Sequence, residues 1–196
     1  MLVSHKHKFV FIHIPKTAGS SVTVSLKNLG QDDAKSSYQH ITCQNLKKIF
    51  DNQRWTWSDY FKFSFVRNPF ARIVSEFHYV KDGHNKNRKK YKFDFKKFIC
   101  KKYFETHVWH HHADPQLNFI SLNKKIEVDF IGRVENLQQD LNIICDKIGI
   151  PRQELPHYNK TEHKHYTEYY DDETRQLVAE KYAKDIEYFG YEFGKD

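Results

Sequence analysis

Residues 9–29 read FVFIHIPKTAGSSVTVSLKNL, and this stretch decides how the chain begins to fold. Apolar residues 9–14 predict a buried strand, and the polar turn at residues 15–21 contains a lysine, a glycine and hydroxyl side chains. Apolar residues recur at helical spacing from Val22 onward. A strand, a lysine-bearing turn and a helix together favour an anion site, because unpaired amides and the helix dipole attract a phosphate or sulfate.

The turn supplies several candidate anion ligands. They are Lys16, Thr17, Ala18, Gly19, Ser20 and Ser21. The lysine adds a full charge, the hydroxyls can donate hydrogen bonds, and the glycine would let the backbone approach a ligand closely. In a Walker loop the lysine follows a second glycine, whereas Lys16 precedes the only glycine here. On this segment alone, an ordinary strand-to-helix connection with a surface lysine stays open.

A second segment repeats the arrangement. Residues 60–66, YFKFSFV, predict a buried strand, and Arg67 stands where that strand ends, at the edge where open α/β sheets bind ligands. Pro69 then begins a helix that carries Ser75, which can face the same anion. The alternative is that Arg67 is a surface ion-pair partner and Ser75 a neutral helix residue.

Together the two segments resemble the carbohydrate-type sulfotransferases (heparan and chondroitin type, sulfotransferase family 2), whose sulfate donor is 3′-phosphoadenosine 5′-phosphosulfate (PAPS). HIPKTAGSS is similar to the family's loop for the 5′-phosphosulfate. FVRNPFARIVSEF is similar to its element for the 3′-phosphate, with Arg67 and Ser75 as ligands. Residues 130–137, 155–160 and 185–191 are similar to later family blocks, so the resemblance covers nearly the whole chain.

The resemblance implies a three-layer α/β, P-loop-like sulfotransferase fold. Strands separated by helices likewise favour a mainly parallel central sheet flanked by helices, and 196 residues suit one sulfotransferase domain over residues 1–196. We expect further helices at residues 44–50, 93–103 and 137–148, a last helix capped by Asp171 and Asp172, and short strands at residues 117–122 and 128–131.

A sulfuryl transfer needs charge stabilisation and a general base, as a phosphoryl transfer does. Lys16 is expected to stabilise the leaving phosphate. In the resembled family a histidine in a Gly-His context acts as the base, and His40 holds the matching place between the two motifs, with Gln39 in place of the glycine. An unperturbed histidine has a pKa of about 6.5 and can accept a proton at neutral pH. His40 and Lys16 are therefore the expected catalytic residues.

Further along the chain the sequence leaves roles open. Lys160 follows a family block next to a loop that closes over the nucleotide, so it is expected to reach the 3′-phosphate unless it is an exposed loop lysine. Arg133 follows a strand, as Arg67 does, or pairs with Glu135. The histidine cluster between His107 and His112 favours a solvated or acceptor-facing surface over a metal site, and we expect no metal cofactor.

The composition is compatible with a sulfotransferase but does not select it over other classes of protein. A formal net charge of +7 suits an anionic cofactor or a sulfated polymer, and would equally suit nucleic acid or a membrane surface. Three widely separated cysteines argue against a disulfide framework. The polar N-terminus and the lack of a long apolar run predict a cytoplasmic enzyme without membrane insertion, in preference to an excised Golgi-type domain.

The expected reaction is sulfuryl transfer from PAPS to an acceptor hydroxyl on a carbohydrate, leaving 3′-phosphoadenosine 5′-phosphate (PAP); no nucleic-acid partner is expected. Two alternatives stay open. A P-loop-like nucleotide kinase would use Lys16 for ATP, but the chain lacks the Walker order and an evident Mg²⁺-binding aspartate. A non-catalytic polyanion-binding module would explain the charge and the basic run at residues 81–92, but not two strand-turn-helix anion sites.

Overall fold

The structure is a computed structural model that describes residues 2–27, 40–81, 94–103, 111–156 and 164–195. The chain forms two compact units. Unit 1 comprises Met1–Val66 and Gln116–Asn159, and unit 2 comprises Arg67–Pro115 and Lys160–Asp196. Each unit is described by itself below.

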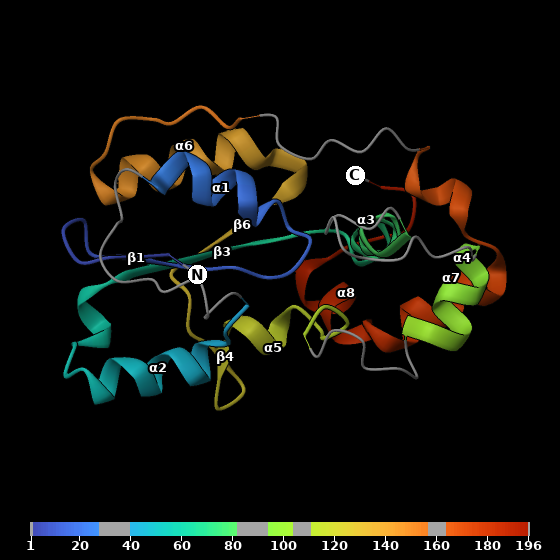
Figure 1. Cartoon of the computed structure of the whole chain (residues 1–196), viewed down its shortest axis with the longest axis horizontal. Coiled ribbons are helices and arrows are strands. Elements are labelled where there is room, and N and C mark those ends of the chain that lie inside the picture. Colours follow the sequence, from blue (N-terminus) through green and yellow to red (C-terminus); the bar gives the residue numbers. More distant parts are fainter. Residues whose placement is uncertain (1, 28–39, 82–93, 104–110, 157–163, 196) are drawn as a thin grey trace. The chain divides into compact units, whose positions relative to one another are not determined.

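Unit 1 contains a four-stranded sheet with the strand order β1-β2-β3-β6 (Figure 1). Strands β2 (Phe9–Ile12), β3 (Phe61–Val66) and β6 (Phe130–Arg133) run parallel, and β1 (Leu2–Ser4) pairs antiparallel with β2. The mainly parallel sheet predicted from the sequence is therefore confirmed. The edge strand β1 was not predicted.

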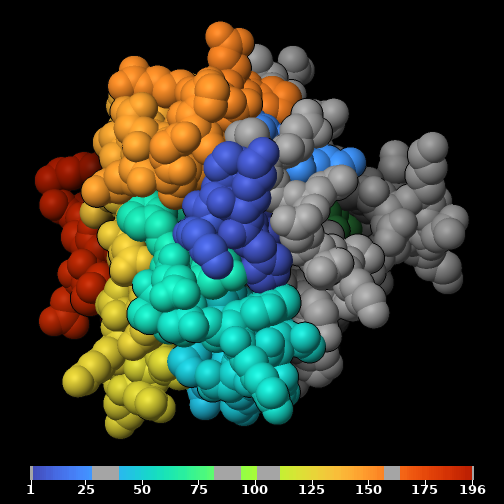
Figure 2. Space-filling view, turned by 90° about the vertical axis from the view of Figure 1, so that its left-hand side faces the viewer, coloured from blue at the N-terminus to red at the C-terminus, as the bar shows by residue number. Residues whose placement is uncertain are grey.

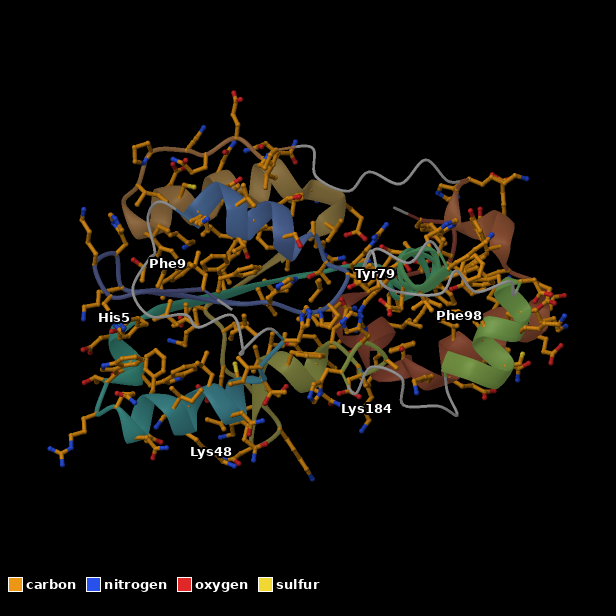
Figure 3. All side chains as sticks on the ribbon, in the orientation of Figure 1. His5, Phe9, Lys48, Tyr79, Phe98 and Lys184 are labelled. Carbon is orange, nitrogen blue, oxygen red and sulfur yellow. The ribbon has the colours of Figure 1, made fainter. Side chains whose placement is uncertain are left out.

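Helices cover both faces of this sheet, which explains why β2 and β3 are almost continuously buried. Figure 1 shows α1 (Gly19–Leu26) and α6 (Leu137–Ile148) on one face and α2 (Cys43–Asn52) on the other. Phe9, labelled in Figure 3, belongs to the core between the sheet and α1 and α6. Buried residues of that core are Leu2, Phe9, Phe11, Val22, Leu26, Phe63, Phe65, Leu141, Ile144, Cys145 and Ile150.

Figure 2 shows the N-terminal hairpin in dark blue between two surfaces. The orange surface is formed by α6 and the segment that follows it, and the teal surface by α2 and the turn that follows it. His5, just beyond β1, packs edge-on against Trp55 with ring centroids 4.2 Å apart. Its Nδ1 lies 2.6 Å from the hydroxyl of Tyr60. These contacts attach the hairpin to the short helix η3 (Trp57–Asp59) and its flanks.

The strand predicted at residues 117–122 is wrong for residues 117–120. The structure has a helical turn α5 (Leu117–Ile120), followed by a two-residue strand β4 (Ser121–Leu122) that pairs with β5 (Lys125–Ile126). Phe119 and Ile120 are fully buried, and the Phe119 amide donates to the carbonyl of Gln116, three residues earlier, at 3.1 Å, as in a helical turn. The Ser121 hydroxyl also donates to the carbonyl four residues earlier, as in a helix.

Both helix predictions in unit 1 are confirmed, with shifted ends for α2 and the predicted bounds for α6. Helix α2 begins after Thr42, whose hydroxyl accepts a hydrogen bond from the Asn45 amide. The short helix η5 (Val134–Asn136) leads into α6, which stops at Gly149 in a left-handed conformation, φ 70°. The predicted strand at residues 128–131 is observed two residues later as β6.

Unit 2 is helical and has an aromatic core. Its helices are α3 (Pro69–Lys81), α4 (Phe95–Lys97), the π-helical turn η4 (Phe98–Tyr103), η6 (Tyr166–Tyr169), α7 (Asp172–Lys181) and α8 (Ala183–Phe189). Phe77 of α3 packs against Phe95 and Phe98, the latter labelled in Figure 3, with ring centroids 5.4 Å apart in each pair. The helix predicted at residues 93–103 is thus present as two short pieces.

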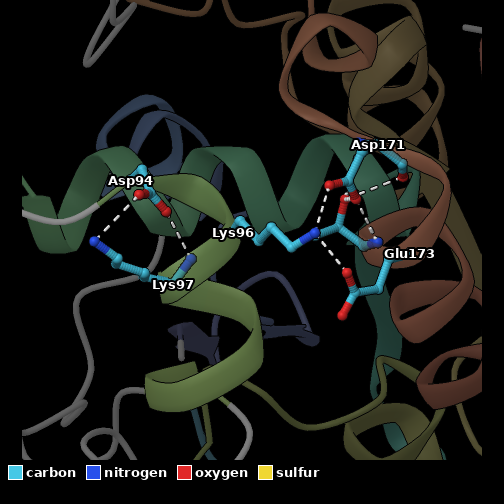
Figure 4. A network of polar contacts seen from close by, with 6 residues as sticks. Asp94, Lys96, Lys97, Asp171 and Glu173 are labelled. Atoms are coloured by element: carbon cyan, nitrogen blue, oxygen red, sulfur yellow. Dashed lines mark hydrogen bonds and ion pairs between the residues drawn. The ribbon is translucent and has the colours of Figure 1, made fainter.

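An exposed ionic network joins α4 to the start of α7 (Figure 4). Lys96 lies 3.0 Å from Asp171 and also contacts Glu173. Asp171 accepts a hydrogen bond from the Thr174 amide in a capping box that begins α7. The predicted cap is thus confirmed for Asp171, whereas Asp172 is the first residue of the helix and α8, not α7, is the last helix. Hydrogen bonds from Thr174 and Lys96 hold the pKa of Asp171 well below its usual range.

Candidate active site

The carboxyl ends of the parallel strands in unit 1 carry the predicted basic residues. Ile12 lies opposite Ser64, and Val66 lies opposite Arg133, so β2, β3 and β6 end at the same edge of the sheet. The loop that contains Lys16 follows β2 at this edge, and Val66 is the residue directly before Arg67 in the chain. This is the edge where open parallel sheets bind ligands.

The Lys16 loop, residues 15–21, has an unusual backbone. Lys16 (φ 66°) and Ala18 (φ 59°) are both left-handed although neither is glycine. Such a conformation costs roughly 1–2 kcal/mol for each residue, so the surrounding structure must hold it. Turns with left-handed residues direct successive backbone N–H groups into anion-binding concavities. Helix α1 begins after Ala18 without a side-chain cap, which suits an N-terminus that serves a ligand.

The hydroxyl side chains of this loop have different environments. Thr17 is fully buried and its hydroxyl donates to the carbonyl of Ile14 at 3.0 Å, so that side chain holds the turn. Ser20 is exposed and Ser21 is mostly buried. Lys16 itself is half-buried. The backbone of Thr17, rather than its hydroxyl, is therefore its route to an anion.

Gly19 lies directly against a neighbouring ring. A Cβ atom built on Gly19 would lie 1.9 Å from Cδ2 and Nε2 of His13. Gly19 is the first residue of α1 and is not among the residues with positive φ, so its backbone conformation would accept alanine. The structure thus gives a reason for this glycine that differs from the close approach of a ligand predicted from the sequence.

His40 contacts His13, which lies two residues before the Lys16 loop in the chain. Its Nδ1 is 3.1 Å from the backbone carbonyl of His13, and the two ring centroids are 4.5 Å apart. Because a carbonyl can only accept, Nδ1–H is the donor, and a neutral imidazole then has its lone pair on Nε2. His40 is left-handed, φ 63°; Gln39, the predicted departure from the family pattern, lies outside the described residues.

Two other features border this part of unit 1. Burial, reinforced by the charge of Glu127, raises the pKa of the Cys43 thiol to about 12, so this thiol is not a nucleophile at neutral pH. A cavity of about 560 Å³ opens beside the mostly buried Ser21. Its lining residues are Ser21, Leu137, Gln138, Glu154, Leu155 and Pro156.

In unit 2, the turn after Arg67 is fixed by Asn68. This fully buried side chain accepts from the Phe70 amide at 3.1 Å, which begins α3. Its Nδ2 lies 3.0 and 3.1 Å from the carbonyls of Glu192 and Lys195 and 3.3 Å from the hydroxyl of Tyr166. The Arg67 turn, residues 67–70, is therefore attached to the C-terminal segment. Ser75 is half-buried on α3.

Helix α3 also buries two side chains of charged residue types, Arg72 and Glu76, each with its own partners. Arg72 donates to the carbonyls of His112 and Asp114 at 3.0 and 2.9 Å. Glu76 is fully buried, and its Oε2 lies 2.9 Å from His112 Nδ1. Part of the histidine cluster is thus structural, while His107 lies outside the described residues, as does His110. Within the described ranges, no group of three or more histidine, cysteine, aspartate or glutamate side chains could hold a metal ion.

Two further predictions have separate outcomes. Lys160 lies outside the described residues. Arg133 is half-buried, and its backbone amide donates to Asp140 at 2.6 Å, so the end of β6 is attached to α6. Sequence reasoning missed two residues of this region. The role of Asn68 could have been predicted, because an asparagine directly before a proline is typical of a helix start. No sequence pattern indicated a role for His13.

Comparisons with known proteins identify several relatives of this chain. The chain is 26% identical to carbohydrate sulfotransferase 14 of Danio rerio over 97% of its own length and 62% of that protein. It is 26% identical to carbohydrate sulfotransferase 9 of Homo sapiens, over 94% of its length and 47% of that protein. An uncharacterized protein of Archaeoglobus fulgidus is 32% identical over 55% of the chain and 77% of that protein.

The chain thus spans between about half and two thirds of the length of these two carbohydrate sulfotransferases. None of the helices that the structure describes is long and apolar enough to cross a membrane. The family model for sulfotransferases matches residues 1–192. The resemblance noted in the sequence is therefore confirmed, and the chain belongs to the sulfotransferase family.

Proposed function

We propose that this protein transfers a sulfuryl group from PAPS to an acceptor hydroxyl on a carbohydrate. The observation that carries the proposal is the Lys16 loop with His40 beside it, at the carboxyl edge of the parallel sheet in unit 1. An anion loop supplies one requirement of sulfuryl transfer, and a histidine whose Nε2 can accept a proton supplies the other. Two relatives named carbohydrate sulfotransferases support the acceptor class.

In the proposed mechanism the acceptor oxygen attacks sulfur in line with the bridging oxygen to the 5′-phosphate. The acceptor hydroxyl gives its proton to His40 Nε2 as the new S–O bond forms. The S–O bond to the 5′-phosphate breaks, and the electron pair leaves with PAP. Lys16 and the amides of the loop stabilise the negative charge that develops on the leaving phosphate, which is the largest contribution expected from such a site.

We assign the 5′-phosphosulfate to Lys16, Ser20, Ser21 and the backbone of residues 17–19. The 3′-phosphate is assigned to Arg67 and Ser75, with Lys160 as a further ligand. The resemblance of both motifs to the family supports these roles, as does the position of Lys16 and Arg67 after parallel strands. The proposal treats residues 1–196 as one catalytic domain with a P-loop-like fold that works without a metal.

A reducing compartment such as the cytoplasm is proposed as the place of action. Cys43, Cys100 and Cys145 are all free thiols in the structure, which such a compartment would preserve.

The test is transfer of radiolabelled sulfate from PAPS to a panel of desulfated glycans, with and without EDTA. Transfer to at least one glycan, unchanged by EDTA, is expected. Thermal unfolding with PAP and with ATP and Mg²⁺ is measured in parallel. If ATP with Mg²⁺ stabilises the protein more than PAP does, and no sulfate is transferred, the protein is a nucleotide kinase instead. Equal, salt-sensitive stabilisation by unrelated polyanions would indicate a polyanion-binding module.

A further inference from the structure

His13 contacts both parts of the proposed active site in unit 1. Its backbone carbonyl accepts the Nδ1–H of His40 at 3.1 Å, and its ring lies edge-on to that of His40 with centroids 4.5 Å apart. On the other side, the same ring occupies the space that a Cβ of Gly19 would fill. The ring of Phe11 stacks on it with centroids 5.7 Å apart. His13 is thus held between the sheet, the helix start and His40.

These contacts define distances that matter for the reaction. Gly19 begins α1, so the His13 ring limits how close the first turn of this helix can come to the end of β2. The same residue fixes His40 through its carbonyl and ring. Because one residue contacts both the base His40 and the start of α1, the distance between the base and the Lys16 loop stays constant. In-line transfer is sensitive to a change of about 1 Å in that distance.

We infer that His13 is a positioning residue of the sulfuryl transfer: it sets the distance between the base His40 and the helix start that closes the Lys16 loop. The inference rests on the proposed function. It also assigns Gly19 a role, because a glycine at this position leaves room for the His13 ring. We call His13 and Gly19 a matched pair, since the ring fits only where residue 19 has no side chain.

The first test removes the ring. His13→Ala is expected to lower kcat by about 10–100-fold, because His40 and the helix start lose their common contact. The Kd for PAP should stay within about threefold of wild type, since the loop ligands remain. A merely structural residue would not separate kcat from cofactor binding in this way. If His13→Ala does not fold, His13→Asn replaces it, with the same expectation because the shorter amide cannot reach both neighbours.

The matched control is His5→Ala. His5, labelled in Figure 3, is also a half-buried histidine of unit 1 with aromatic ring contacts, and it lies beyond β1, next to the opposite end of β2. Its loss should lower the melting temperature without changing kcat. If His13→Ala retained kcat within twofold of His5→Ala, the inference would be wrong while the proposed function would stand.

The second test is steric complementation. Gly19→Ala places a methyl group on the His13 ring and is expected to lower both PAP affinity and the melting temperature. The double variant His13→Ala/Gly19→Ala should recover both, to the values of His13→Ala alone, because its backbone tolerates alanine once the ring is gone. A double variant as impaired as the sum of the two single changes would overturn the matched pair.

The two proposals fail separately. If wild-type protein transfers no sulfate to any acceptor, the proposed function fails. The matched pair of His13 and Gly19 is then still decided by melting temperature and PAP binding of the double variant.

Discussion

The Lys16 loop and the Arg67 turn both lie between a strand and a helix and both carry a basic residue. They differ in the contacts that fix their backbones. In unit 1, the Lys16 loop has two left-handed non-glycine residues, and its helix starts without a side-chain cap. In unit 2, the turn after Arg67 contains a fully buried asparagine whose side chain has four polar neighbours.

On the proposed assignment of the two phosphates, this difference corresponds to two kinds of anion site. A strained loop with an uncapped helix start has backbone N–H groups available for a ligand whose charge changes during the reaction. A turn whose backbone is fixed by a buried amide instead suits a phosphate that is held equally in the ground and transition states. The first site is thus expected to contribute to kcat, and the second to binding.

The largest expected effect comes from removing the charge of the strained loop. Lys16→Ala should lower kcat by about 10²–10³-fold, because one preorganised contact to the developing charge is lost. Sulfate transfer at saturating PAPS measures it. Lys8→Ala is the matched control, since Lys8 is also left-handed, φ 51°, but lies before β2. A Lys16→Ala variant with near-normal kcat would show that the loop serves binding only.

Asn68 is the most sensitive residue of the second turn. Asn68→Ala should lower the free energy of unfolding by roughly 3 kcal/mol, because several hydrogen bonds are lost and buried partners are left unpaired. This corresponds to a fall of about 6–12 °C in the melting temperature. Asn68→Asp should be nearly as costly, since a carboxylate cannot donate to the carbonyls of Glu192 and Lys195.

Two further variants test whether the Arg67 turn is more firmly fixed than the Lys16 loop. Asn142→Ala, which removes a solvent-exposed hydrogen bond on α6, should leave the melting temperature within about 1–2 °C of wild type. Thr17→Val in the Lys16 loop removes one buried hydrogen bond, so it should cost about 1 kcal/mol. If Thr17→Val cost more than Asn68→Ala, the second turn would not be the more firmly held of the two.

Arg67→Ala is expected to weaken PAPS binding by about 10–100-fold, the usual value of a charge-assisted contact to phosphate. Because this phosphate is remote from the reacting bond, kcat at saturating PAPS should change less than about threefold. Initial rates over a range of PAPS concentrations separate the two parameters. Arg175→Ala, an exposed arginine of α7, serves as the control. A fall in kcat with unchanged KM would reverse the assigned role.

Much of this arrangement could be predicted from the sequence, and the failures have physical causes. The apolar runs before Pro15 and Arg67 specify buried strands, and family-like motifs mark both turns. The strand predicted at residues 117–122 failed because a short apolar run has no periodicity that separates a strand from a buried helical turn. His13 was missed because its role depends on the absent side chain of Gly19, a contact that no sequence spacing reveals.

The smallest expected effect concerns the exposed network of unit 2. The pKa of Asp171 is lowered in the folded protein, so its stabilising contribution is present above the unfolded pKa of about 3.9 and is lost as the pH falls toward the folded value. Asp171→Asn keeps a cap but removes the charge. Its melting temperature should therefore be slightly below wild type at pH 7, and the difference should shrink steadily between pH 4 and pH 2. A difference that stays constant from pH 7 to pH 2 would show that the charge is not the cause; Glu180→Gln is the control.

The most direct measurement of the central claim is calorimetric titration of wild type, Lys16→Ala and Arg67→Ala with PAP, adenosine 5′-phosphate and adenosine 3′-phosphate. We predict that wild type binds one PAP per chain. Lys16→Ala should weaken PAP and the 5′-phosphate but not the 3′-phosphate, and Arg67→Ala should show the opposite pattern. If both variants weakened the two monophosphates equally, or if either left PAP binding unchanged, the separate assignment of the two phosphates to the two turns would be contradicted.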